Sequence, residues 1–202
     1  MTKIKLCGLM RPEDIEAANE LCPDYVGFVF ASKSKRYVSA EEAKNLKAQL
    51  RPEIKAVGVF VNEKIETVLS AVTASIIDAA QLHGDEDADY IARLRERAAR
   101  PLPIVQAFRV KTAEDIAKAR ESAADLVLLD AGSGAGISFD WSLAREMNRP
   151  YFLAGGLCAE NVGAATRKLK PYGVDVSSGI ETDGRKDKDK MAAFVYAIRK
   201  ES

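Results

Sequence analysis

The stretch YFLAGGLCAENVGAATRKLKPYGVDVSSG, residues 151–179, contains two strand-to-helix turns in succession. Its apolar runs 151–154 and 173–176 predict strands, and a helical pattern covers 159–169 between them. Each run breaks on a turn of small residues, and these are Gly155, Gly156, Ser177, Ser178 and Gly179. Such turns direct backbone N–H groups toward a point where the helix dipole attracts an anion. Two consecutive turns of this kind are typical of the phosphate site that (β/α)8 barrels form after strands 7 and 8, with ordinary connecting loops as the alternative.

The same alternation of short apolar runs and helical patterns extends through the whole chain. Strands are predicted at 3–7, 25–30, 55–61, 78–82, 104–108, 125–130, 151–155 and 173–177. Strict alternation implies a parallel sheet, and eight units without an order reversal favour a closed (β/α)8 TIM barrel. A Rossmann-like sheet is the alternative, but no G-x-G-x-x-G motif follows the first strand.

Capping residues mark where the helices begin. Pro12 stands before two acidic residues, and Ser39 with Glu42 forms a capping box. Asn62 and Thr112 precede two further helical patterns and are predicted N-caps. The remaining helical patterns cover 87–100, 159–169 and 187–200. The charge run 185–190 is most simply interpreted as a solvated helix start.

Length and composition predict an ordinary globular protein. The 202 residues favour one barrel domain over 1–202, with a sizeable core. The 30 basic and 30 acidic residues balance, which argues against a nucleic-acid or membrane-surface partner. No signal peptide is evident and no apolar run approaches ~18 residues, so the expected compartment is the cytoplasm. Cys7, Cys22 and Cys158 have no metal-binding spacing and are expected to be reduced thiols.

Candidate catalytic residues follow from the strand ends, because barrel active sites lie at the C-terminal ends of the strands. Cys7 ends the first strand, Asp130 ends the sixth, and Arg36 follows the second. Strands 6, 7, 8, 1 and 2 are neighbours in a closed ring. We therefore expect these three side chains to share one arc of the barrel mouth with the phosphate turns. A carboxylic acid and a thiolate there can divide general acid and base catalysis between them.

Each candidate also has a structural alternative. Lys5 shares a strand face with Cys7, where it either favours the thiolate or forms an internal ion pair with Asp175. Asp130 is alternatively a helix N-cap, and Arg36 a surface charge. His83, the only histidine, is as compatible with a loop contact to backbone as with catalysis, and it receives no role.

Several motifs together resemble the phosphoribosylanthranilate isomerase family along nearly the whole chain. They are KLCGL at 5–9, YVGFVFASKSKRYVS at 25–39, VGVFVN at 57–62, QLHGDE at 81–86, GISFDW at 136–141, FLAGGLCAENV at 152–162 and GVDVSSGIETDGRKD at 173–187. The resemblance implies a (β/α)8 barrel that needs neither metal nor cofactor. It implies an Amadori rearrangement of N-(5-phosphoribosyl)anthranilate, an aminoaldose, to 1-(2-carboxyphenylamino)-1-deoxyribulose 5-phosphate, with this small molecule as the partner.

Roles for individual residues also come from the resemblance. It implies that Asp130 is the general acid, Cys7 the general base and Arg36 the ligand of the anthranilate carboxylate. Asp175 is expected near a ribose hydroxyl, and the turns at Gly155-Gly156 and 177–179 near the phosphate. One departure concerns the loop after the sixth strand, where Gly134-Ala135-Gly136 stands in place of the family's Gly-Thr-Gly.

Three alternatives remain from the sequence. One is a different phosphate-binding barrel, such as an epimerase or the synthase acting one step later. Another is a catalytically silent barrel that serves as a binding module, which the presence of both Cys7 and Asp130 argues against. A second isomerase activity on a related aminoaldose also stays open. The sequence is compatible with a monomer or a homodimer.

Overall fold

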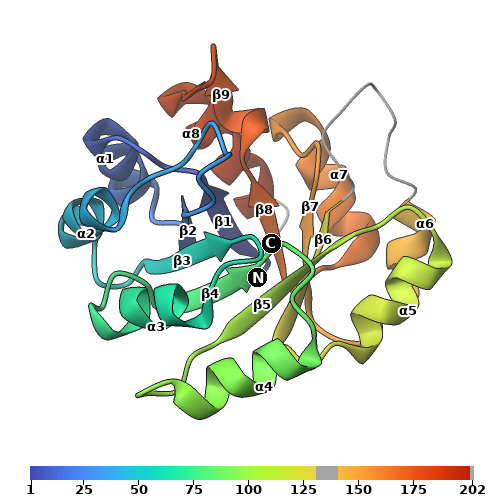
Figure 1. Ribbon diagram of the computed structural model, residues 1–202. Coiled ribbons are helices and arrows are strands. Elements are labelled where there is room, and N and C mark those ends of the chain that lie inside the picture. Colours follow the sequence, from blue (N-terminus) through green and yellow to red (C-terminus); the bar gives the residue numbers. More distant parts are fainter. Residues whose placement is uncertain (131–140, 201–202) are drawn as a thin grey trace.

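The computed structural model describes residues 1–130 and 141–200, with only the backbone described at positions 141 and 142. Its centre is a closed barrel of eight parallel strands in the order β1 to β8 (Figure 1). The strands are β1 Lys3–Cys7, β2 Tyr25–Val29, β3 Lys55–Phe60, β4 Ala79–Leu82, β5 Ile104–Arg109, β6 Leu126–Asp130, β7 Tyr151–Ala154 and β8 Gly173–Val176. The barrel that the alternating pattern predicts is confirmed.

The helices lie around the outside of this barrel (Figure 1). They are α1 Pro12–Leu21, α2 Ala40–Gln49, α3 Ile65–Thr73, α4 Ala88–Arg97, α5 Ala113–Glu121, α6 Trp141–Ala144, α7 Ala159–Leu169 and α8 Lys188–Arg199. A 3-10 turn, η1 Ser178–Ile180, and a small hairpin, β9 Glu181–Thr182 with β10 Arg185–Lys186, lie between β8 and α8. None of the helices in the described ranges is long and apolar enough to cross a membrane.

Most helix starts agree with the capping signals. The Ser39 hydroxyl accepts the N–H of Glu42 at 3.2 Å, and the Glu42 carboxylate accepts the N–H of Ser39 at 2.7 Å. The prediction for Asn62 is wrong, because α3 begins later, at Ile65. Asn62 has a left-handed φ of 50°, and its side-chain oxygen instead accepts the N–H of Asp85 at 2.7 Å. It therefore ties the loop after β3 to the loop after β4.

Three aspartates secure the N-terminal end of the barrel in the same way. Each stands just before an even-numbered strand and accepts the N–H of the preceding odd-numbered strand. The pairs are Asp24 with Ile4 at 2.9 Å, Asp78 with Ala56 at 2.7 Å and Asp125 with Ile104 at 2.8 Å. Each carboxylate also pairs with a cation, from Lys3, Lys47 and Arg95 in turn. These contacts satisfy backbone donors at the strand starts, where the parallel ladder does not supply an acceptor.

We expect Asp78→Ala to lower the free energy of unfolding by about 1–3 kcal/mol, because it leaves the N–H of Ala56 without an acceptor. Asp78→Asn keeps an acceptor oxygen and should recover most of that loss. Urea titration of both variants measures the difference. Asp89→Ala, which removes an exposed carboxylate 3.7 Å from Arg93, is the control and should change stability by less than about 0.5 kcal/mol. Equal effects of Asp78→Ala and Asp89→Ala would contradict this role.

Candidate active site

A cavity of about 210 Å³ opens at the C-terminal ends of the strands. Its lining includes most of the residues that the sequence singled out: Cys7, Arg36, Asp130, Gly155, Gly156, Asp175, Ser177 and Ser178. His83 also lines it. Gly179 does not line this cavity, because it packs against Leu157, and a Cβ there would collide with the Leu157 carbonyl oxygen. The close approach of the turns after β7 and β8 therefore depends on Gly179.

Lys5 and Asp175 form a buried ion pair beneath the cavity. Lys5 Nζ lies 2.9 Å from Asp175 Oδ1, and the two residues are register partners in the pairing of β1 with β8. Burial alone lowers the pKa of Lys5, but the Asp175 carboxylate and the Cys7 thiol raise it above its ordinary value. Lys5 is consequently a cation at neutral pH, in the internal ion pair that was one of its two predicted roles.

Burial has the largest influence on the pKa of Cys7. It raises the pKa of the Cys7 thiol above its ordinary value of 9.0, and the Asp175 carboxylate raises it further. The ammonium groups of Lys5 and Lys186 lower this pKa, but by less than burial and Asp175 raise it. Lys5 therefore lowers the pKa of Cys7 in the predicted direction, but burial and Asp175 outweigh it in the ligand-free molecule, where Cys7 remains a thiol at neutral pH.

The side chain of Asp130 faces His83 across the cavity. His83 Nε2 lies 3.4 Å from Asp130 Oδ2, and His83 Nδ1 lies 3.0 Å from the amide nitrogen of Gln81. An amide nitrogen only donates, so in this orientation of Gln81 the ring proton is on Nε2 and points toward the carboxylate. Gln81 Oε1 is buried without a hydrogen-bond partner in the described part of the chain. His83, to which the sequence assigned no role, thus contacts the carboxylate of Asp130.

The glycine turn after β7 presents backbone donors to the cavity. Gly155 and Gly156 have left-handed φ angles of 87° and 64°. Their N–H groups have no acceptor among the residues that the structure describes. The turn after β8 lies next to it, and Ser177 Oγ donates to the carbonyl of Cys7 at 3.1 Å. Consecutive unpaired N–H groups in such turns form a site suited to an anion.

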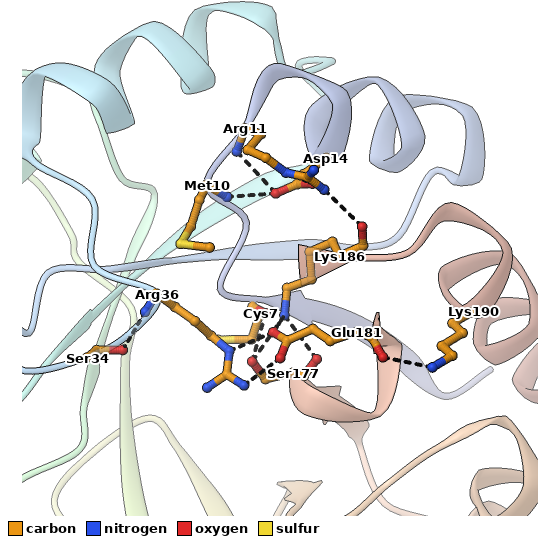
Figure 2. Close-up of polar contacts among 10 residues, drawn as sticks. All are labelled: Cys7, Met10, Arg11, Asp14, Ser34, Arg36, Ser177, Glu181, Lys186 and Lys190. Atoms are coloured by element: carbon orange, nitrogen blue, oxygen red, sulfur yellow. Dashed lines mark hydrogen bonds and ion pairs between the residues drawn. The ribbon is translucent and has the colours of Figure 1, made fainter. Parts of the chain in front are cut away.

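Arg36 lines the cavity and belongs to a charged network with Glu181 and Lys186 (Figure 2). Its Nε and Nη2 donate to the two carboxylate oxygens of Glu181 at 2.6 and 2.7 Å. Lys186 Nζ donates to Glu181 Oε1 at 2.5 Å, and to the carbonyl and hydroxyl oxygens of Ser177 at 2.9 and 3.2 Å. The two cations outweigh the effect of burial and lower the pKa of Glu181 to about 2. At Lys186 the effect of burial is larger than that of Glu181, so the pKa of the ammonium group is lowered.

Sequence reasoning missed both Glu181 and Lys186. The interpretation of 185–190 as a solvated helix start is wrong for Lys186, whose side chain is only 1% exposed. Lys186 pairs with Glu181 across the hairpin of β9 and β10. The turn of this hairpin is Asp183-Gly184, both with positive φ. An Asp-Gly pair is a strong signal for a two-residue hairpin turn. A hairpin predicted from this signal places Lys186 opposite Glu181.

The loop at 131–136, including Gly134-Ala135-Gly136, lies outside the described residues. Among the residues that are described, no group of three or more His, Cys, Asp or Glu side chains is arranged to hold a metal ion.

Comparison with known proteins gives one consistent family. Residues 4–197 match the family described as N-(5'phosphoribosyl)anthranilate (PRA) isomerase. An N-(5'-phosphoribosyl)anthranilate isomerase of Acetivibrio thermocellus is 48% identical over 98% of this chain and 96% of its own length.

Solved structures of this family have the same fold. A phosphoribosyl anthranilate isomerase in complex with reduced 1-(o-carboxyphenylamino)-1-deoxyribulose 5-phosphate superposes with a TM-score of 0.87. It is 37% identical, over 99% of this chain and 100% of the other. Monomers generated from the dimeric phosphoribosylanthranilate isomerase of Thermotoga maritima superpose with a TM-score of 0.85, also at 37% identity, over 98% of this chain and 99% of the other.

The raised pKa of Cys7 predicts how its alkylation by iodoacetamide depends on pH. Because only the thiolate reacts, the rate at Cys7 should rise about tenfold per pH unit between about pH 7 and 9. Peptide mass spectrometry separates Cys7 from the other thiols. The control is the same peptide in urea, where burial is absent and the rate should level off at lower pH. A rate at native Cys7 that is already constant near neutral pH would show that the thiolate is present.

Proposed function

The chain belongs to the N-(5'-phosphoribosyl)anthranilate isomerase family, and from this premise we propose how the residues around its cavity catalyse the Amadori rearrangement. The protein is an enzyme, an isomerase of tryptophan biosynthesis. One observation carries the proposal for its residues. Cys7, Asp130 and Arg36 line a single cavity together with the turns after β7 and β8.

The two anionic groups of N-(5-phosphoribosyl)anthranilate bind at two places in this cavity. The phosphate binds to the N–H groups of Gly155 and Gly156 and to the turn at 177–179, of which Ser177 and Ser178 line the cavity. The anthranilate carboxylate takes the guanidinium of Arg36, whose planar fork matches a carboxylate. A solved relative binds the reduced form of the rearranged product, a ligand with the same two anionic groups, which supports this arrangement.

Asp130 acts as the general acid. It donates its proton to the furanose ring oxygen, the bond from C1 to that oxygen breaks, and the lone pair of the anthranilate nitrogen forms the C1=N bond. The product of this step is an open-chain protonated Schiff base. The contact with His83 at 3.4 Å supports the role, because it holds the carboxyl group toward the cavity.

Cys7 acts as the general base. As a thiolate it accepts the C2 proton, the C–H electrons form the C1=C2 bond, and the C=N pair returns to nitrogen. The resulting enolamine tautomerises to the ketone. Burial raises the pKa of the ligand-free thiol, whereas Lys5 and Lys186 lower it. The positive charge of the Schiff base adds to those two ammonium groups, so ring opening favours the thiolate when it is needed.

Asp175 has a supporting role in this scheme. Its Oδ1 is engaged by Lys5, and Oδ2 has no partner in the described part of the chain. Since Asp175 lines the cavity, Oδ2 is suited to accept a hydrogen bond from a ribose hydroxyl. We also propose that the protein is located in the cytoplasm. The protein is proposed to be a monomer or a homodimer, and the Thermotoga maritima relative is described as dimeric.

The acid and base assignments predict that Asp130→Asn and Cys7→Ala each lower kcat by roughly 10²–10⁴ without unfolding the barrel. The measurement is the loss of fluorescence of freshly generated N-(5-phosphoribosyl)anthranilate. Cys22→Ala, which removes an exposed thiol, is the control and should have wild-type kcat. Near-normal turnover of either active-site variant removes that residue from its role. Phosphate-ligand binding without turnover by the wild type would instead indicate a silent barrel.

The carboxylate site predicts a different kinetic signature for Arg36→Ala. KM for the anthranilate substrate should rise roughly ten- to hundredfold, because a charge-assisted contact is lost. The aniline analogue, which carries the same phosphoribosyl group without the carboxylate, is the matched control and should keep its KM. An unchanged KM for the anthranilate substrate would rule out Arg36 as the carboxylate ligand.

A further inference from the structure

Glu181 contacts two cations, and one of them, Arg36, lies outside its hairpin. Its side chain is 8% exposed, and its two oxygens accept from Arg36 Nε, Arg36 Nη2 and Lys186 Nζ (Figure 2). We propose that Glu181 is a positioning residue, which fixes Arg36 for end-on binding of the substrate carboxylate and thereby sets the preference for a carboxylated arylamine. This inference rests on the proposed function of Arg36.

The argument begins with the shape of the guanidinium group. Glu181 occupies its side edge, formed by Nε and Nη2. The end edge, formed by Nη1 and the second hydrogen of Nη2, has no acceptor among the residues that the structure describes. A second carboxylate therefore fits end-on without displacing Glu181. Arg36 lines the cavity, and under the proposal the substrate carboxylate meets this edge there.

The rest of Arg36 is also held in place. A Cβ added to Gly8, which has a φ of 78°, would lie 2.5 Å from Arg36 Cδ, so the side chain passes directly over this glycine. The N–H of Arg36 donates to Ser34 Oγ at 3.1 Å. Glu181 is thus the third constraint, and it acts on the tip of the side chain. A guanidinium fixed in this way loses less conformational freedom when the substrate binds.

Glu181 itself is anchored from several elements. Lys190 Nζ donates to its backbone carbonyl at 2.8 Å, and Arg11 Nη2 donates to the carbonyl of Lys186 at 2.9 Å (Figure 2). Lys186 Nζ has three acceptors, on Glu181 and Ser177, which matches the three hydrogens of an ammonium group. The hairpin carrying Glu181 is therefore tied to α1, to α8 and to the turn after β8.

Lys186 also keeps the cluster attractive to an anion. A carboxylate beside Arg36 alone would neutralise it, whereas Arg36, Lys186 and Glu181 together carry one net positive charge. The pKa of Glu181, lowered to about 2, keeps it ionised at neutral pH. The arrangement thus orients Arg36 without cancelling its charge.

Two substitutions separate geometry from charge. Glu181→Gln removes the negative charge, and because both Glu181 oxygens accept from Arg36, its amide NH2 must face an Arg36 donor in either orientation, so the fork is displaced. Positioning predicts a higher KM for the anthranilate substrate, roughly ten- to hundredfold. Charge alone predicts a lower KM, because the cluster then carries two net positive charges. Glu181→Asp keeps the charge but shortens the side chain, and under the proposal it also raises KM.

The kinetics are measured with the anthranilate substrate and with its aniline analogue. Positioning requires that the Glu181 variants raise KM for the first and leave KM for the second within about threefold. Thr182→Val is the matched control, because Thr182 lies in the same hairpin and the change removes only its contact with Asp187, the N-cap of α8, without touching Arg36. It should not discriminate between the two substrates. Circular dichroism of each variant checks that the barrel is folded, and Glu181→Asp carries the test if Glu181→Gln is not.

The outcomes distinguish this inference from the proposal on which it rests. If Arg36→Ala leaves KM unchanged, the carboxylate site itself is wrong. If Arg36→Ala raises KM selectively but neither Glu181 variant does, Arg36 keeps its role and the positioning role is overturned. A lower KM in Glu181→Gln, or equal effects on both substrates, overturns it as well. Positioning further requires that Glu181→Gln adds nothing in the Arg36→Ala background.

Discussion

The ion pair of Lys5 with Asp175 is the interaction on which the rest of this barrel depends. The two residues are register partners of β1 and β8, the strands that close the ring, and both are buried. Removing one partner of such a pair leaves an uncompensated charge and typically costs about 3–5 kcal/mol. A shift in this register would break the pair, so the contact specifies how the seam closes. Closure in that register brings the end of β1 beside the turn after β8, where Ser177 donates to the carbonyl of Cys7.

The seam also explains the electrostatics of the site. A thiol at the end of β1 is buried because the barrel closes around it, and burial raises its pKa. The compensating cations come from below, with Lys5, and from above, with Lys186. Each is itself paired with a carboxylate, Asp175 or Glu181, so neither is an isolated buried charge. The result is a buried thiol whose pKa stays above its ordinary value, although two neighbouring ammonium groups favour its ionisation.

Much of this architecture could be predicted because it depends on local sequence. The strands follow from short apolar runs, and the start of α2 follows from the Ser39 capping box. Arg36 and Asp130 were found because barrel sites lie at strand ends. What was missed depends on contacts between distant segments. Three such contacts can be seen only in the tertiary fold. Asp78 accepts the N–H of Ala56, His83 contacts Asp130, and Asn62 joins the loops after β3 and β4. Lys186 was missed because a charge run usually lies in solvent, although the Asp-Gly turn before it carried the necessary local signal.

The site residues on the barrel strands and those on the hairpin of β9 and β10 differ in how well they tolerate substitution. Lys5 and Asp175 pair across the seam of β1 and β8, so altering either disturbs the closure of the barrel. Glu181 and Lys186 belong to a hairpin inserted between β8 and α8, and the barrel ladder does not include them. Changes there can alter how Arg36 meets a substrate while the seam stays intact. A (β/α)8 barrel varies its specificity in loops above a fixed sheet, and here the loop acts through an arginine contributed by another βα unit.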